Sequence, residues 1–132
     1  RRSVVLTTRK VVGNVRGVYD TGHAKTAKTA LGAGRYLTWT ICEGVAEAIG
    51  GIRAAGYGLV GGELADQAVP INEAALPEKA CLAFGHEDRG LSATTLAACD
   101  VVAFIPQLGK VGSLNVSTAA GIALYELNRR GW

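Results

Sequence analysis

The sequence predicts an α/β fold: a single domain with a mostly parallel sheet flanked by helices. Two observations carry this prediction. Short apolar or β-branched runs alternate along the chain with segments whose apolar residues recur at helical spacing. Two of the runs, Cys81–Phe84 and Val101–Ile105, are continuously apolar, as parallel strands covered on both faces are. No repeat, low-complexity tract or linker interrupts the pattern, so we expect one domain over residues 1–132.

The first part of the chain predicts two strand–helix pairs. Ser3–Thr8 is a β-branched run and predicts the first strand. Ala24–Leu31 carries alanines at helical spacing and ends at glycines, which predicts a helix. Arg35–Ile41 alternates apolar and polar residues and predicts a second strand. Val45–Ile52 carries the next helical stripe, which ends at Gly56.

The second part predicts three more strands and a closing helix. A short strand is expected at Tyr57–Gly62, followed by a connector over Ala65–Lys79 that holds two of the three prolines. The two continuously apolar strands come next. The last helix is the clearest element, because Val116–Leu127 places its apolar residues on one face and is closed by basic residues and a glycine.

Composition sets broad limits on function. The chain is 48% hydrophobic with 18 glycines, which is typical of a globular, loop-rich domain. Its net charge of +3, without a run of basic residues, permits a polyanionic partner but does not require one. Three cysteines without a CxxC pair indicate reduced thiols in a cytoplasmic protein, and no metal is expected. No apolar stretch reaches the roughly 20 residues of a membrane span, and no signal peptide is evident.

Two apparent motifs do not fit their context. Gly56–Gly61 matches the G-x-G-x-x-G dinucleotide fingerprint, but that fingerprint needs a strand before it and a helix after it. Here a helix precedes the glycines and a strand overlaps them. Asn115–Ser117 matches a glycosylation sequon, although nothing else indicates secretion.

The first informative segment follows the strand that ends at Phe84. Gly85 and Gly90 lie in a tight polar loop there, and glycines at the carboxyl end of a strand let the backbone approach a ligand closely. Glu87 lies in the same loop. It either fixes an RNA or a neighbouring loop, or it is an ordinary solvated turn carboxylate.

The second informative segment runs from Ile105 to Ser117. Again a buried strand ends, a glycine-rich loop follows and a helix begins. By propensity alone, Ser113 or Asn115 would cap that helix. The functional interpretation adds that the loop forms a concave pocket, with the side chains at the start of the helix facing a ligand.

Together, the two segments resemble the SpoU/TrmH family of the SPOUT methyltransferases. Phe84–Glu87 (FGHE) with Gly90–Ser92 (GLS) is similar to the second motif of the family. Ile105–Gln107 (IPQ), Gly109 and Ser113–Ser117 (SLNVS) are similar to the third. The order and the separation of the motifs also fit, and the resemblance covers about the last fifty residues closely.

The resemblance implies a fold and a cofactor. The family fold is an α/β knot, in which the C-terminal segment threads through a loop to form a deep trefoil knot, a rare topology. The knot binds S-adenosylmethionine. The residues that match its binding positions are Gly85, Ile105, Ser113 and Leu114, and Gly61 with Gly62 should form a wall of the adenine pocket. Family members act as homodimers, and most methylate ribose 2′-hydroxyls in tRNA or rRNA.

The resemblance also implies roles in catalysis. Glu87, Ser113 and Asn115 would organise the substrate ribose and the catalytic loop. Lys110, Arg89 and Arg16 are candidate contacts to RNA phosphates, which position RNA without reading its sequence.

The first motif of the family departs from its pattern here. The family has Asn, then Gly two residues later, then Arg; an alignment places Asp20, Gly22 and Thr26 at these positions, so the arginine is missing. Asn14 and Arg16 are candidate displaced equivalents. His23 and Lys25, near the start of the helix, are further candidates to handle the hydroxyl proton.

Two function classes therefore remain open. The chain is expected to be an S-adenosylmethionine-dependent RNA 2′-O-ribose methyltransferase, with base methylation as a variant. The alternative is a non-catalytic knotted scaffold that binds RNA or cofactor, and the departure in the first motif motivates it.

Overall fold

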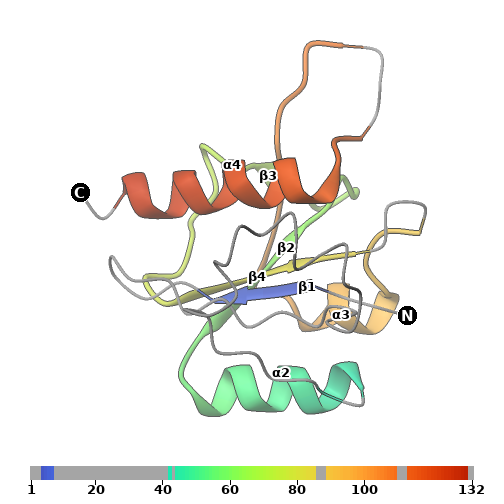
Figure 1. Ribbon diagram of the computed structural model, residues 1–132, viewed down its shortest axis with the longest axis vertical. Helices are drawn as coiled ribbons and strands as arrows, with labels where there is room; N and C mark the ends of the chain where they lie inside the picture. Colours follow the sequence, from blue (N-terminus) through green and yellow to red (C-terminus); the bar gives the residue numbers. More distant parts are fainter. Residues whose placement is uncertain (1–3, 8–41, 43, 86–88, 110–112, 131–132) are drawn as a thin grey trace, which may run out of the picture.

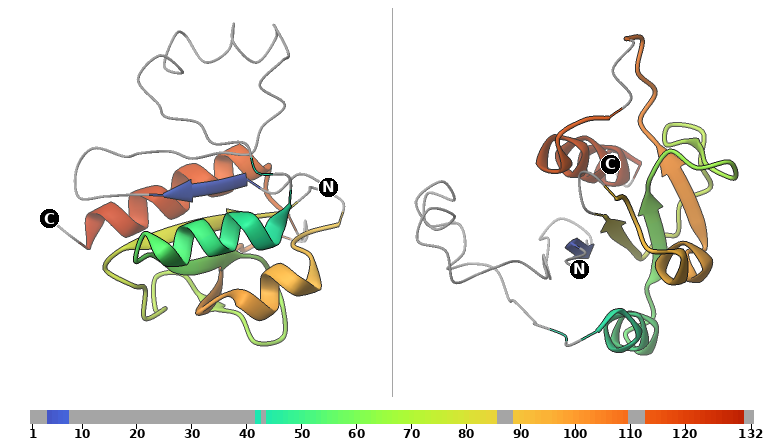
Figure 2. Two further views of the ribbon diagram at one scale, coloured as in Figure 1. Left: turned by 90° about the horizontal axis from the view of Figure 1, so that it is seen from below. Right: turned by 90° about the vertical axis from the view of Figure 1, so that its right-hand side faces the viewer.

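The computed structural model describes residues 4–7, 42, 44–85, 89–109 and 113–130. A sheet separates two helical layers (Figure 1). Helix α4 (Val116–Arg129) covers one face, whereas α2 (Val45–Ala54) and α3 (Ala93–Ala98) lie side by side on the other (Figure 2). This arrangement confirms the predicted α/β class with helices on both sides of the sheet. Within the described residues, no helix has the length and apolar character needed to cross a membrane.

The sheet has the strand order β1-β4-β2-β5-β3. Four strands run parallel: β4 (Ala80–Phe84), β2 (Gly58–Gly62), β5 (Val101–Phe104) and the two-residue β3 (Val69–Pro70). Strand β1 (Val4–Thr7) pairs with β4 in the antiparallel direction at one edge. The sheet is therefore mostly parallel, as predicted. The helix expected over 24–31 and the strand expected over 35–41 lie outside the described residues.

The sequence analysis did not predict two of the elements. Strand β3 lies inside the segment interpreted as a connector, where Val69 pairs with Ala103 of β5. Its second residue is Pro70, which cannot donate a ladder hydrogen bond and is tolerated at an edge position. Helix α3 is only six residues long, and Ser92 caps it by accepting a hydrogen bond from the Thr95 amide at 3.2 Å.

The core lies on both faces of the sheet because successive strand residues point in opposite directions. Val60 and Leu82 pack in the cluster beneath α4, whereas Leu59 and Cys81 pack toward α2 and α3. All four side chains are almost fully buried. Burial on both faces explains why the strands read as continuous apolar runs rather than as alternating ones.

A polar contact joins the second layer to the sheet. The Arg53 guanidinium of α2 donates to the Asp100 carboxylate and to the carbonyl of Ala98, while the same carboxylate accepts the Leu59 amide at 2.7 Å. The Arg53 guanidinium, together with the Leu59 amide, lowers the pKa of Asp100. Both members of the pair are exposed, so its value lies in orienting α2 more than in stability.

A second contact fixes the C-terminal end of α4. Arg130 donates to the carbonyls of Ile71 and Ala74, at 2.7 and 2.6 Å, and also to the carboxylate of Glu126 at 3.0 Å. Arg129 donates to the same carboxylate. The end of the helix is thereby joined to the turn that follows β3.

Candidate ligand-binding site

A cavity of about 620 Å³ opens where the carboxyl ends of the parallel strands meet the N-terminal half of α4. Its size is that of a small-molecule site. Val60, Leu82 and Ala103 form an apolar floor from the core beneath α4. The rim comes from the segments that follow β2, β4 and β5, as expected for a ligand site in an open parallel sheet. After β5 the chain extends away from the sheet and beyond α4 (Figure 1).

Glycines bring the backbone of these segments into close contact. A Cβ atom on Gly85 would lie 1.9 Å from the carbonyl carbon of Gly90 and 2.2 Å from the Leu91 nitrogen. A Cβ atom on Gly62 would lie 2.3 Å from the ring of Phe84. A side chain at Gly85 would displace the Gly90–Leu91 peptide and one at Gly62 would displace the Phe84 ring, so both positions require glycine.

The cofactor-binding residues that the resemblance implied converge on this cavity. Gly61, Gly85, Ile105, Ser113 and Leu114 all line it, although they come from four separate segments of the chain. Gly62 lines it as well. Ser113 is exposed, whereas Ile105 and Leu114 are half-buried.

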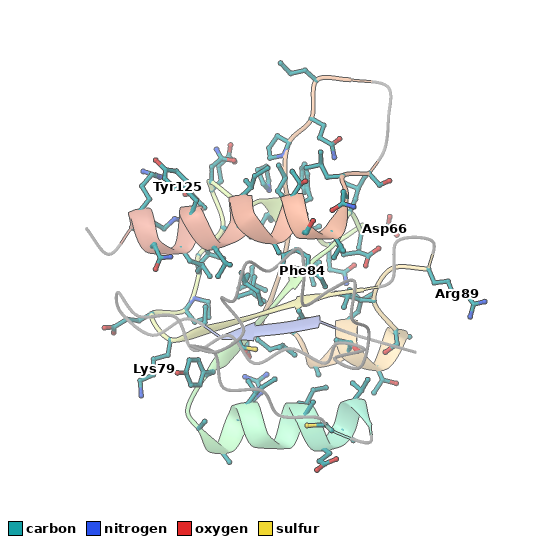
Figure 3. All side chains as sticks on the ribbon, in the orientation of Figure 1. Asp66, Lys79, Phe84, Arg89 and Tyr125 are labelled. Atoms are coloured by element: carbon teal, nitrogen blue, oxygen red, sulfur yellow. The ribbon has the colours of Figure 1, made fainter. Side chains whose placement is uncertain are left out.

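The residues with expected catalytic roles are only partly described. Asn115 is not part of the cavity lining; it caps α4, and its side-chain oxygen accepts hydrogen bonds from the Ser117 amide, at 2.9 Å, and from the Ser117 hydroxyl. Of the two predicted caps, Asn115 is the one used. Arg89 lines the mouth of the cavity, and its side chain points away from the sheet (Figure 3).

Several predicted residues have no described position. Those that lie outside the described residues are Glu87, Asn14, Arg16, Lys110, His23 and Lys25.

Glu63 is a cavity residue that the sequence prediction missed. It directly follows β2, and its carboxylate accepts a hydrogen bond from the Leu91 amide at 2.6 Å. Gly90, the residue before that amide, has a φ of +62°, and a Cβ atom there would lie 2.2 Å from a Glu63 oxygen. The sequence feature that could have indicated Glu63 is its position directly after the strand expected at Tyr57–Gly62, whose carboxyl end was expected to form part of the cofactor pocket.

The electrostatics of the cavity are simple. Glu63 and Arg89 are the charged side chains that line it among the described residues. The thiol of Cys99 lies behind Gly61, and burial raises its pKa. Burial also raises the pKa of Cys81 to about 12, so both thiols are protonated at neutral pH. The cavity is thus suited to bind and orient a ligand, and neither cysteine supplies a ready nucleophile.

The structure confirms that Gly56–Gly61 is not a dinucleotide fingerprint. Gly56, with a φ of +77°, forms the turn after α2, and Gly58 and Gly61 lie within β2. No helix begins within the described residues 62–85 that follow these glycines; the backbone of Glu63 instead donates to Ala103 of β5. A pyrophosphate would therefore meet no helix N-terminus here.

Comparison with known proteins agrees with this geometry. Residues 1–125 match the SpoU rRNA Methylase family. The tRNA (guanosine(18)-2′-O)-methyltransferase of Escherichia coli is 29% identical over 131 residues, which cover 97% of this chain and 57% of the relative. An uncharacterised tRNA/rRNA methyltransferase of Archaeoglobus fulgidus is 37% identical over 103 residues, 78% of this chain and 45% of the relative.

Solved structures show the same fold. The AdoMet-bound rRNA methyltransferase from Sinorhizobium meliloti superposes with a TM-score of 0.78 at 26% identity, over 85% of this chain and 42% of that protein. The SpoU methyltransferase AviRb from Streptomyces viridochromogenes, in complex with AdoMet, gives 0.76 at 27% identity, over 86% of this chain and 46% of that one. The chain thus spans about half the length of these proteins. Since the family match covers almost the whole chain, the protein belongs to the SpoU rRNA methylase family.

Proposed function

We propose that this chain is the catalytic domain of an S-adenosylmethionine-dependent RNA methyltransferase that modifies ribose 2′-hydroxyls in tRNA or rRNA. One observation carries the proposal: the residues that match the family's cofactor positions line a single cavity, although local patterns did not require them to meet. The relatives named above support both the cofactor and the class of substrate.

The residues of the cavity fit the cofactor. An apolar floor suits the faces of an adenine ring, and a rim that excludes side chains at Gly62 and Gly85 leaves backbone donors and acceptors for polar atoms. Ile105, Ser113 and Leu114 would hold the remaining part of the ligand. When bound, S-adenosylmethionine supplies a methyl group on a positively charged sulfur.

The task of the protein is then mainly to position the ribose. We assign Glu87, Ser113 and Asn115 to organising the substrate and the loop before α4. The position of Ser113 in the cavity lining supports its part, whereas the contact described for Asn115 is the cap of the helix. Arg16, with Asn14 beside it, is assigned to orienting the 2′-hydroxyl by donating hydrogen bonds, because arginine holds its own proton too tightly to act as a base. Arg89 and Lys110 are assigned to RNA phosphates, and the outward direction of Arg89 supports its part (Figure 3).

The assembly belongs to the same proposal. We assign to this chain the C-terminal trefoil knot of the family, and we propose that it acts as a homodimer in the cytoplasm. Ile122 and Tyr125 on α4 are 39% and 58% exposed, which supports an interface on this helix. Light scattering of the purified protein tests the dimer, and Tyr125→Lys should shift it to the monomer.

The first experiment is calorimetric titration with S-adenosylmethionine, with NAD as the control. Saturable binding of the first ligand alone is expected, and absence of binding would remove the basis of the proposal. Transfer of a labelled methyl group to total tRNA and rRNA then tests activity. Resistance of the product to a nuclease that requires a free 2′-hydroxyl distinguishes ribose from base methylation. Glu87→Ala should sharply lower the transfer.

A non-catalytic scaffold is the second candidate. It is favoured by the first motif, in which Thr26 occupies the position where the family has arginine. Tight cofactor binding without methyl transfer to any cellular RNA would support this candidate over the first.

A further inference from the structure

Two residues from different strands contact the peptide between Gly90 and Leu91. Gly85, at the end of β4, packs so closely on this peptide that a Cβ atom would lie 2.1 Å from the Gly90 oxygen. Glu63, at the end of β2, accepts a hydrogen bond from the Leu91 amide at 2.6 Å. Gly85, Glu63 and Gly90 all line the cavity, so this peptide is part of its wall.

Glu63 also contacts β5, the third strand that contributes to the cavity. Its backbone amide donates to the carbonyl of Ala103 in β5 at 3.1 Å, and Ala103 lies on the cavity floor. The residue therefore joins β5 through its backbone and the loop after β4 through its side chain. The Leu91 side chain is fixed independently, because it is buried on the other face of the sheet.

From these contacts we propose that Glu63 is a positioning residue for the S-adenosylmethionine pocket. Its carboxylate holds the Gly90–Leu91 peptide against Gly85 and so fixes the shape of the rim. Only the identity of the ligand rests on the proposed function; the contact itself is independent of it.

The carboxylate also accounts for the glycine at position 90. A Cβ atom there would lie 2.2 Å from one Glu63 oxygen and 2.6 Å from the other, and the backbone has a φ of +62°. The Glu63 carboxylate therefore occupies the space that a side chain at position 90 would need, so the presence of Glu63 requires glycine there.

The proposal predicts a graded effect on cofactor affinity. A hydrogen bond to a charged acceptor contributes enough that its loss in Glu63→Ala should weaken S-adenosylmethionine binding by roughly tenfold or more, because the rim then samples forms that do not bind. Glu63→Gln keeps an acceptor at the same place, and it should recover binding to within about fivefold of the wild type.

A control separates this role from a general loss of stability. Arg53→Ala removes the contact between α2 and Asp100, which is outside the cavity lining. Because the pair is exposed, the substitution should lower the melting temperature only slightly and leave the affinity for S-adenosylmethionine unchanged. The proposal would be overturned if Glu63→Ala and Arg53→Ala weakened the binding of S-adenosylmethionine equally. It would also be overturned if Glu63→Ala and Glu63→Gln weakened that binding equally.

A second measurement tests the contact without any ligand. Amide hydrogen exchange, followed by NMR, should show slow exchange of the Leu91 amide in the wild type and in Glu63→Gln, and fast exchange in Glu63→Ala. If the wild type binds no S-adenosylmethionine but shows this exchange pattern, the proposed function fails and the contact stands. If the wild type binds and Glu63→Ala changes neither affinity nor exchange, the inference about Glu63 fails and the function stands.

Discussion

Replacing Gly85 by alanine tests whether the rim of the cavity depends on backbone packing. The new Cβ atom would lie 1.9 Å from the Gly90 carbonyl carbon, whereas ordinary contacts begin at 3.4 Å. The two segments must therefore separate by about 1.5 Å. Both partners are backbone, so a change of side-chain rotamer cannot relieve the clash.

The cost can be built from two parts. Overpacking costs about 1–3 kcal/mol, and separation of the segments breaks the hydrogen bond between Glu63 and Leu91, worth about 1.5–3 kcal/mol because its acceptor is charged. The sum, about 2.5–6 kcal/mol, is a large part of the 5–15 kcal/mol that stabilises a typical domain. We expect a folded protein whose melting temperature is lower by about 10–20 °C, and whose cavity no longer fits its ligand.

Differential scanning calorimetry and titration with S-adenosylmethionine measure the two effects. Gly51→Ala is the matched control, because a Cβ atom at this exposed position in α2 meets nothing within 4 Å. It should stabilise the protein by roughly 0.5–1 kcal/mol through helix propensity, with the affinity unchanged. A Gly85→Ala protein that melts and binds like the wild type would refute the close packing of the rim.

Three further predictions concern other parts of the fold. The pKa of Glu126 is lowered from its ordinary 4.5 to about 2, mainly by the hydrogen bond from Arg129 and also by that from Arg130. The charged carboxylate therefore stabilises the fold above pH 4.5, and this contribution is lost as the pH falls toward 2. Glu126→Gln should lower the melting temperature at neutral pH and flatten its decline in acid; an unchanged acid profile would contradict this. Cys81, whose pKa is raised to about 12, should resist iodoacetamide in the native protein and react after unfolding, as mass spectrometry of its peptide would show; native labelling would count against its burial. Asn115→Ala should cost about 1 kcal/mol in urea unfolding through loss of the cap, whereas Asn115→Ser should restore stability without restoring methyl transfer; equal stability of both variants would disprove the capping role.

The parts of the fold that local pattern determines were predictable. Ala80–Phe84 is buried on both faces, and a continuously apolar strand is the direct result. Helix α4 carries one apolar stripe because only one of its faces meets the sheet. Strand β3 was missed because two residues, one of them proline, leave no periodic signal, and its pairing with β5 depends on residues far along the chain.

In the candidate site, too, the features set by local sequence were predictable and those set by distant contacts were not. The positions of Gly85, Ile105 and Ser113 followed from motifs that are contiguous in the sequence, and the cavity brings them together. The role of Glu63 could not be predicted, because its partner Leu91 lies 28 residues later and no local spacing relates the two. Contacts of this kind depend on the order of the strands, which a single sequence does not specify.

The floor of the cavity and the core beneath α4 are largely the same residues. Val60, Ile71, Leu82, Phe84, Ala103 and Ala123 belong to both. A ligand in the cavity therefore completes the interior of the protein, and its binding free energy adds to the free energy of folding. The lifetime of such a protein in a cell would follow the supply of its ligand, falling when that supply is depleted. Selection on stability alone would also preserve the floor, so that new specificities would have to arise from the rim.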